Sequence, residues 1–216
     1  MVLLFCFCAA FLPAQTANND ARSVAARIDA RYNAMHSLSA EFTEIYSGGG
    51  VKRSESGHLW IKKPGHMRWD YQTPRVKLFV TDGRTAWFYV PGEHQARRTA
   101  IKKLDDLRSP LRYLLGHTRL EKELRGLSLA TDLKPEKAGN VLLRGVPAGM
   151  EDRVSWLLLE VDAQGFIRRF VMGELDGSRT EFRLENQREN ATISDAEFNF
   201  TPPPGVEVLQ NDRIVP

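Results

Sequence analysis

The sequence is almost free of cysteine: Cys6 and Cys8 are the only two among its 216 residues. Both lie in the first apolar segment, which we expect to be removed on export. The mature chain would then have no disulfide and no thiol nucleophile. A lipid anchor on either cysteine is also disfavoured, because Phe5 and Phe7 stand where a lipoprotein cleavage site needs small residues.

Motifs for catalysis and metal binding are missing as well. The five histidines are scattered, without His-x-His or His-Glu-x-x-His spacing, so we expect no metal site. There is no Gly-x-Ser-x-Gly turn for a serine nucleophile. The triplet at residues 48–50 lacks the Lys-Ser/Thr pair of a phosphate loop. We therefore predict a protein that is not an enzyme and has no cofactor.

Neither sign of charge is in large excess, since the net charge is +3. Basic pairs occur at residues 97–98, 102–103 and 168–169, and we interpret them as solvated strand faces. A mild attraction to anionic membranes or to an acidic partner stays open. No nucleic-acid recognition motif is present, so we expect no nucleic-acid partner.

Long hydrophobic runs are absent after the N-terminus. Residues 1–12 (MVLLFCFCAAFL) are apolar throughout but too short to span a bilayer. They fit the apolar region of a secretory signal, although no Lys or Arg precedes them. We predict a signal peptide over residues 1–14, cleaved between 14 and 17, and one soluble exported domain over residues 18–216. The alternative is a buried first strand or helix.

One amphipathic helix is predicted after the signal. Asn18 or Asn19 is placed to cap a helix that begins near Asp20. Its apolar positions recur at helical spacing and form one stripe of Val24, Ile28, Tyr32 and Met35.

Residues 57–89 hold the most informative pattern of the chain. Short alternating runs rich in Trp, Tyr and Phe are separated by breakers at residues 63–65, 73–74 and 82–83. The pattern predicts consecutive antiparallel strands with an unusually apolar face. An earlier strand over residues 40–47 leads into the turn at the Gly triplet.

The second half of the chain predicts short helices and further hairpins. Ser109-Pro110 begins a short helix that ends at Gly116, and residues 118–125 are a second helical candidate. Strands follow at 141–144, 155–161, 165–173 and 180–187, and a last strand at 196–206 is stopped by the Pro run. The predicted class is α+β, mainly β.

Such a sheet has more apolar surface than one long helix covers, and this favours a protein that binds an apolar ligand. Alternation puts Met67, Trp69 and Tyr71 on one face, and Leu78 and Val80 in another inward set. It does not tell which parity of each strand faces a cavity, and ordinary core packing is the alternative at each position. The candidate wall residues are Leu59, Trp60, Met67, Trp69, Leu78, Val80, Trp87, Tyr89, Phe170 and Phe182.

Three blocks resemble a known family. These are residues 57–71 (GHLWIKKPGHMRWDY), 80–91 (VTDGRTAWFYVP) and 200–206 (FTPPPGV). With the order of predicted elements, they resemble the outer-membrane lipoprotein carrier protein family (LolA) over essentially the whole mature chain.

The resemblance implies an incomplete, strongly curved antiparallel β-barrel, with the N-terminal helix and short lid helices over an apolar cavity for the acyl chains of lipoproteins. A carrier of this kind is a periplasmic protein, and we expect a monomer. It receives cargo from an inner-membrane lipoprotein-releasing ABC transporter and passes it to an outer-membrane receptor. The matching lid residues are Leu111, Leu114 and Leu115.

One position departs from the family pattern. An Arg before the Pro of the first block bonds lid carbonyls in the family, and here that position is Lys63. Lys lacks the rigid fork of Arg, so our hypothesis is that Lys63 contacts the lid but holds it more loosely; a plain surface lysine is the alternative. Met67 replaces a lid-side aromatic and still suits an adaptable apolar wall.

Two other functions fit the same pattern. One is a periplasmic module that senses lipid or misplaced lipoprotein, although such proteins usually add a second domain. The other is a carrier of a different amphiphile, such as a glycolipid or a pigment-like lipid. The lipid that co-purifies with the protein distinguishes all three.

Overall fold

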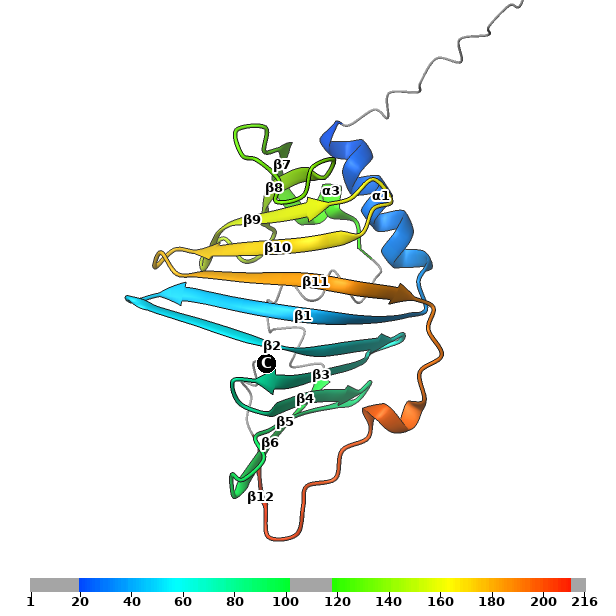
Figure 1. The fold of residues 1–216 in the computed structure, drawn as a ribbon, viewed down its shortest axis with the longest axis vertical. Coiled ribbons are helices and arrows are strands. Elements are labelled where there is room, and N and C mark those ends of the chain that lie inside the picture. The colour runs from blue at the N-terminus through cyan, green and yellow to red at the C-terminus, as the bar shows by residue number, and fades with distance from the viewer. Residues whose placement is uncertain (1–19, 102–117, 211–216) are drawn as a thin grey trace, which may run out of the picture.

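The computed structural model describes residues 20–101 and 118–210. They form one twelve-stranded sheet, an N-terminal helix, and two short helical segments (Figure 1). The helices are α1 (Ala21–Ala34), α3 (Leu120–Glu123) and the 3₁₀ segment η2 (Asp195–Phe198). The strands are β1 (Ser37–Gly48), β2 (Val51–Lys62), β3 (His66–Thr73), β4 (Lys77–Asp82), β5 (Thr85–Tyr89), β6 (Gln95–Ala100), β7 (Leu124–Leu129), β8 (Val141–Pro147), β9 (Val154–Val161), β10 (Ile167–Glu174), β11 (Arg179–Glu189) and β12 (Glu207–Gln210).

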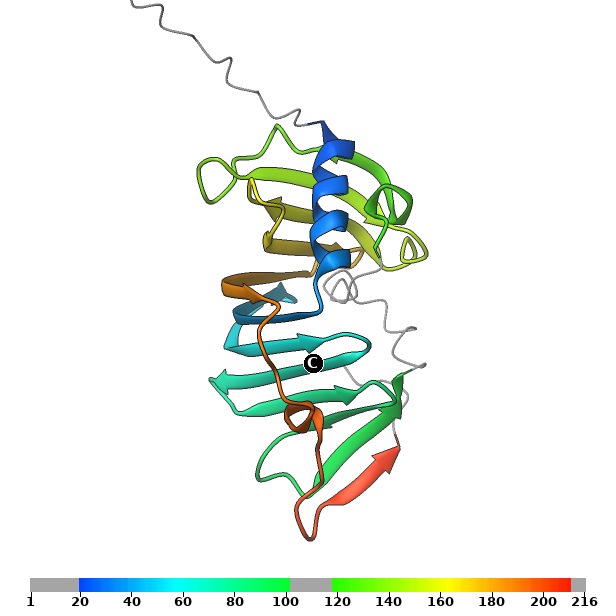
Figure 2. The same cartoon turned by 90° about the vertical axis from the view of Figure 1, so that its right-hand side faces the viewer.

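The sheet is mixed and has two edges in the described part of the chain. Its strand order is β12-β6-β5-β4-β3-β2-β1-β11-β10-β9-β8-β7. All neighbours pair antiparallel except β12, which runs parallel to β6. The purely antiparallel expectation therefore fails at this edge, because the chain returns from β11 along the sheet before it pairs (Figures 1 and 2).

Helix α1 forms where the sequence predicts it, but the cap is different. Asp20 is the N-cap, and its Oδ1 accepts a hydrogen bond from Ser23 N at 2.7 Å. Asn18 and Asn19 lie outside the described residues. The predicted apolar stripe is confirmed, since Val24, Ile28, Tyr32 and Met35 are at most 3% exposed. It packs on α3, β7 and β8.

The predicted turns of the first hairpins are confirmed. Gly49 and Gly50 have φ of 56° and 75°, which favours glycine at both positions of the two-residue β1–β2 turn. The β4–β5 turn is held by Asp82, whose Oδ1 accepts from the backbone N–H groups of Arg84 and Thr85. Local turn chemistry therefore fixes the register of these strands.

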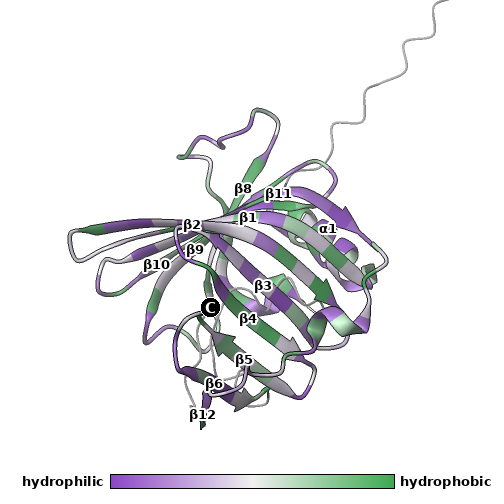
Figure 3. Ribbon diagram, turned by 60° about the horizontal axis from the view of Figure 1, so that its bottom comes forward, coloured by the Kyte–Doolittle hydropathy of each residue, from purple (hydrophilic) through white to green (hydrophobic). Residues whose placement is uncertain are grey.

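Alternation along the strands divides the sheet into two faces (Figure 3). The inner face carries α1, and its core includes Leu59 of β2, Trp69 of β3 and Phe182 of β11 together with the helix stripe. The outer face has its own smaller clusters, one around Val80 and one around Leu158.

The C-terminal part departs from the predicted last strand over residues 196–206. This segment contains η2 and an irregular connection, and only β12 beyond it pairs with the sheet. Phe198 and Phe200 pack onto the outer face, and the three prolines at 202–204 have no N–H to donate to a neighbouring strand. The sequence does not predict strands β6, β7 and β12, because each is only four to six residues long and has no regular alternation of apolar and polar residues.

The basic pair at 168–169 also differs from the expected solvated face. Arg169 is 8% exposed on the outer face, between Glu160 and Glu181, which are 2% and 5% exposed. Its Nε donates to Glu160 Oε2 at 3.1 Å. A buried charge of this kind needs paired partners, and the two strands that flank β10 supply them here.

Two predicted elements lie outside the described residues. These are the signal peptide at 1–14 and the helix starting at Ser109. The candidate helix at 118–125 becomes the single turn α3 followed by β7. None of the helices in residues 20–101 and 118–210 has the length and apolar character needed to cross a bilayer.

Candidate functional site

Five of the ten predicted wall residues lie together on the inner face. They belong to the same buried cluster as the stripe of α1, and each is at most 7% exposed. Their strands are β2, β3, β10 and β11, which lie on both sides of the middle of the sheet. The five are Leu59, Met67, Trp69, Phe170 and Phe182.

The other five lie on the outer face. Leu78 and Val80 alternate with Phe79, which belongs to the inner cluster, so their predicted inward orientation is wrong for β4. Trp87 shows the same alternation against Phe88, as expected for a strand that is apolar on both faces. The outer-face group is Trp60, Leu78, Val80, Trp87 and Tyr89.

A C-terminal strap, residues 191–200, covers the outer-face group. Ile193 and Phe198 pack against Val80, and Phe200 contacts the rings of Trp87 and Tyr89 at centroid distances of 5.6 and 5.5 Å. Sequence alternation cannot predict this, since it gives the period of a strand but not what covers each face.

The strap is also tied to the sheet by hydrogen bonds. Lys62 Nζ donates to the Ile193 carbonyl at 2.9 Å and to Asp195 Oδ1 at 2.6 Å. Arg68 donates to the Glu197 carbonyl at 2.8 Å. The outer-face aromatics are therefore packed by this chain's own residues.

An aromatic row crosses the middle of the inner face. Phe170 stacks on Phe182 at 4.7 Å, and Trp69 meets Phe182 edge-on at 5.6 Å. Phe42 of β1 meets Trp69 at 4.6 Å and Tyr71 at 4.8 Å. We did not select Phe42 from the sequence, although its parity with Ala40 in the predicted first strand was the available signal.

The aromatic row can form because Gly57 of β2 has no side chain. It stands directly between Phe42 and Tyr71 in the sheet register. A Cβ at this position would lie 1.8 Å from the Asp70 carbonyl oxygen. Because no side chain fits there, the two rings meet across the strand.

A polar group, here named the ionic rim, borders the aromatic row. It consists of Glu44, Glu55, Tyr71 and Lys77. The Tyr71 hydroxyl donates to Glu44 Oε2 at 2.8 Å. Lys77 Nζ donates to Glu55 Oε2 at 2.6 Å and lies 4.1 Å from the centre of the Tyr71 ring.

Burial raises the pKa values of two groups in the ionic rim, Glu44 and Tyr71. It raises the pKa of the Glu44 carboxyl above its ordinary value, and the hydrogen bond from Tyr71 offsets only part of this effect. Burial, and then the Glu44 charge, raises the pKa of Tyr71. Tyr71 therefore stays a neutral donor over the accessible pH range.

Lys63 connects the β2–β3 turn to α1. Its Nζ donates to the carbonyl of Tyr32 in the last turn of the helix, and its backbone N–H donates to the His36 carbonyl at 2.9 Å. Burial lowers the pKa of Lys63. The predicted lid residues Leu111, Leu114 and Leu115 lie outside the described residues, so the contact seen is with α1.

Polar bonds fix the other side of α1. Asn33 exchanges two hydrogen bonds with the backbone of Thr118, at 2.9 and 3.0 Å. Asp29 accepts from the Thr118 hydroxyl at 2.7 Å and from Leu120 N at 3.0 Å. Burial raises the pKa of Asp29, against these donors. The helix is thus anchored on both sides over the inner face.

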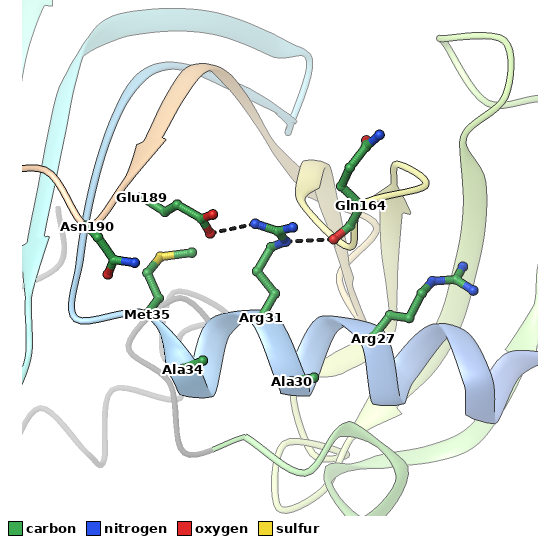
Figure 4. A pocket seen from close by; sticks show the side chains of 8 residues that line it. All are labelled: Arg27, Ala30, Arg31, Ala34, Met35, Gln164, Glu189 and Asn190. Carbon is green, nitrogen blue, oxygen red and sulfur yellow. Dashed lines mark hydrogen bonds and ion pairs between the residues drawn. The ribbon is translucent and has the colours of Figure 1, made fainter.

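A surface pocket of about 380 Å³ lies beside α1, next to the β9–β10 turn and the end of β11 (Figure 4). The Arg31 side chain extends across this pocket. Its Nη1 donates a hydrogen bond to Glu189 Oε2 at 2.5 Å, and its Nε donates one to the Gln164 carbonyl at 2.6 Å. Polar groups thus occupy much of its wall, so hydrocarbon chains do not suit it. It is lined by Arg27, Ala30, Arg31, Ala34, Met35, Gln164, Glu189 and Asn190.

Within the described ranges, no three His, Cys, Asp or Glu side chains gather as they do around a metal ion. What remains at the centre of the molecule is an apolar, aromatic face with a charged border. Such a face suits an amphiphile.

The comparison with known proteins supplies the family. The family model described as "Outer membrane lipoprotein carrier protein LolA" matches residues 33–201. The chain belongs to the LolA family. A protein of Sodalis glossinidius (strain morsitans), named outer-membrane lipoprotein carrier protein, is 30% identical over 203 residues, which are 93% of each chain. One of Serratia proteamaculans (strain 568) with the same name is 26% identical over 211 residues, 95% of each.

Solved structures support the fold alone. An uncharacterised conserved protein from Thermus thermophilus has a TM-score of 0.57 at 12% identity, covering 88% of this chain and 99% of that one. The Mycobacterium tuberculosis lipoprotein LppX has a TM-score of 0.50 at 10% identity, covering 80% and 97%. The fold is therefore kept at sequence identities far below those within the LolA family.

Membership of the LolA family gives the general function of the protein. LolA proteins are periplasmic lipoprotein carriers that act in transport and outer-membrane biogenesis, and they are not enzymes. The prediction of a protein without enzymatic activity is confirmed on this ground.

Proposed function

We propose that this protein is a periplasmic carrier that binds the acyl chains of lipoproteins on its inner face. In this proposal the open sheet is the floor of the lipid site, and the lid over it includes Leu111, Leu114 and Leu115. A signal peptide at residues 1–14 exports the single domain. The carrier takes its cargo from an inner-membrane ABC transporter and gives it to an outer-membrane receptor.

The observation that carries the proposal is the continuous apolar cluster of the inner face with its aromatic row. Helix α1 packs on the β7–β8 side, whereas the row extends to Trp69 on β3. The outer-face aromatics are excluded as an acyl site, because the C-terminal strap packs on them. Of the ten predicted wall residues, the proposal keeps the five of the inner face.

The energetics explain why a carrier is needed and how it can release its cargo. Burying one long acyl chain contributes on the order of 10 kcal/mol, at about 0.8 kcal/mol per CH₂. Free cargo is therefore strongly rejected by water. If lid leucines fill the cavity in the empty carrier, net affinity is the difference between two apolar burials. A receptor that binds slightly more strongly then takes the cargo without ATP at that step.

Direct binding tests the proposal. The purified, delipidated chain is mixed with a synthetic tripalmitoyl-cysteinyl peptide and analysed by native mass spectrometry. We expect a one-to-one complex that keeps the peptide in solution and that releases it to outer-membrane vesicles containing a lipoprotein receptor.

Other outcomes assign another function. A complex with glycolipid but not with the lipopeptide would identify a carrier of a different amphiphile. Tight binding without any transfer would favour a sensing module. If the chain bound no lipid at all, the inner face would be only a core.

A further inference from the structure

Trp69 has a buried donor without an acceptor. The residue is 0% exposed, and its indole Nε1 has no hydrogen-bond partner in the part of the chain that the structure describes. Buried polar groups are nearly always paired, so an exception of this kind needs an explanation. The indole ring that carries this donor belongs to the aromatic row, and its centre lies 4.6 Å from that of the Phe42 ring and 5.6 Å from that of the Phe182 ring.

The residues around Trp69 are arranged in the same order as the parts of an acylated glycerol, from hydrocarbon to polar head. On one side lie Phe182 and Phe170, which suit hydrocarbon. On the other side, two residues along β3 and thus about 7 Å away, Tyr71 begins the ionic rim with Glu44. Along this line the protein therefore presents an apolar surface, then the Trp69 N–H donor, and then the charged groups of the ionic rim.

We propose that Trp69 donates its indole N–H to an ester carbonyl of the bound acyl groups, and so distinguishes ester-linked chains from plain hydrocarbon. The inference rests on the proposed function and specifies its ligand: an ester-linked acyl chain whose polar head lies at the ionic rim. In the empty protein the unpaired donor is a cost, since an unmade buried hydrogen bond is unfavourable. Ligand that supplies a carbonyl removes this cost.

A pair of matched ligands tests the inference. The first is 1,2-dihexanoyl-sn-glycero-3-phosphocholine, and the second is its di-O-hexyl ether, which lacks both carbonyls; each is used below its critical micelle concentration. We expect the wild type to bind the ester about fivefold more tightly, the usual effect of one neutral hydrogen bond. Trp69→Phe keeps an aromatic ring without the donor and should bind both equally.

A control variant and a spectroscopic signal separate this role from packing. Trp87→Phe changes a tryptophan on the outer face, under the strap, and should keep the fivefold preference. In the wild type, the indole N–H proton resonance of Trp69, which is missing from the Trp69→Phe spectrum, should move downfield with the ester and not with the ether. This measurement decides the question even if Trp69→Phe folds poorly.

The outcomes separate the two proposals. If both lipids bind with equal affinity and the indole resonance stays in place, the donor is satisfied by a neighbouring ring and the inference is overturned, while the carrier proposal stands. If neither these lipids nor the lipopeptide bind, both proposals fail together.

Discussion

At the scale of residues, Lys63 links the β2–β3 turn to the end of α1. Its ammonium group donates to the last turn of α1, so it holds the helix end rather than standing free at the surface. We expect Lys63→Leu to lower the free energy of unfolding by about 1 kcal/mol, because the Tyr32 carbonyl loses a charged donor. Urea unfolding measures this.

The same variant tests a role in transfer. Lys63→Arg keeps a donor and should restore most of the stability, while Lys63→Leu should also impair release of bound lipopeptide to a receptor. Unchanged release in Lys63→Leu would leave Lys63 a purely structural residue.

Glu44 gives the second residue-scale prediction, through pH. Burial raises its folded-state pKa, so its contribution to stability is fully present below the unfolded value, near 4.5, and is lost as pH rises through the folded value. The difference in unfolding free energy between wild type and Glu44→Gln should therefore shift in favour of the wild type as pH falls from 8 towards 4.5.

Tyr71→Phe serves as the partner variant. It removes the hydroxyl that stabilises the carboxylate, so the Glu44 carboxyl should titrate at a higher pH in this variant, followed by carbon-detected NMR. A titration curve that is the same in both proteins would contradict the hydrogen bond as a cause.

At the scale of elements, Gly57 shows how one position in a strand shapes a surface. We expect Gly57→Ala to destabilise the protein by roughly 2–4 kcal/mol, because the new Cβ meets backbone that cannot move without breaking the β2–β3 ladder. Gly145→Ala is the graded control: its Cβ would lie 2.9 Å from the Leu124 Cβ, so the cost should be smaller. Equal costs would show that the 1.8 Å contact with the Asp70 carbonyl relaxes freely.

Arg169 ties β9, β10 and β11 together on the outer face. Burial works against the charged forms of Glu160 and Glu181, yet the hydrogen bonds and arginines around them hold both pKa values below the ordinary one. Their contribution is present at neutral pH and lost as pH falls through the folded values. Arg169→Met should cost about 3 kcal/mol at pH 7, and less in acid, as chemical denaturation at several pH values would reveal. A loss that did not depend on pH would point to packing alone.

At the scale of the whole molecule, the two faces should behave differently although both are well packed. Phe182→Ala on the inner face and Val80→Ala on the outer face are each expected to destabilise the protein, by about 3 and 2 kcal/mol. Only Phe182→Ala should weaken lipopeptide binding, by about tenfold, because the Phe182 ring belongs to the inner-face surface on which we propose that the acyl chains bind. Calorimetric titration of both variants is the measurement, and a similar loss in Val80→Ala would mean that the strap opens to cargo.

Much of the fold was predictable because local patterns mark the strands and turns of this chain. The turns at residues 49–50 and 82–83, the helix stripe of α1 and the shared face of Met67, Trp69 and Tyr71 all follow from local rules. Short strands such as β6 and β7 carry no such signal, since their apolar and polar residues do not alternate regularly.

The sequence by itself determined the family, the helix, most strand positions and the apolar character of residues 57–89, because these depend on residue order and period alone. Only the tertiary structure decided which side of each strand faces α1 and that the strap covers Trp60, Leu78, Val80, Trp87 and Tyr89. It also decided that the indole N–H of Trp69 has no partner among the described residues. The physical reason is that alternation is symmetric: it separates two faces of a strand, and only long-range packing makes one of them the inner face.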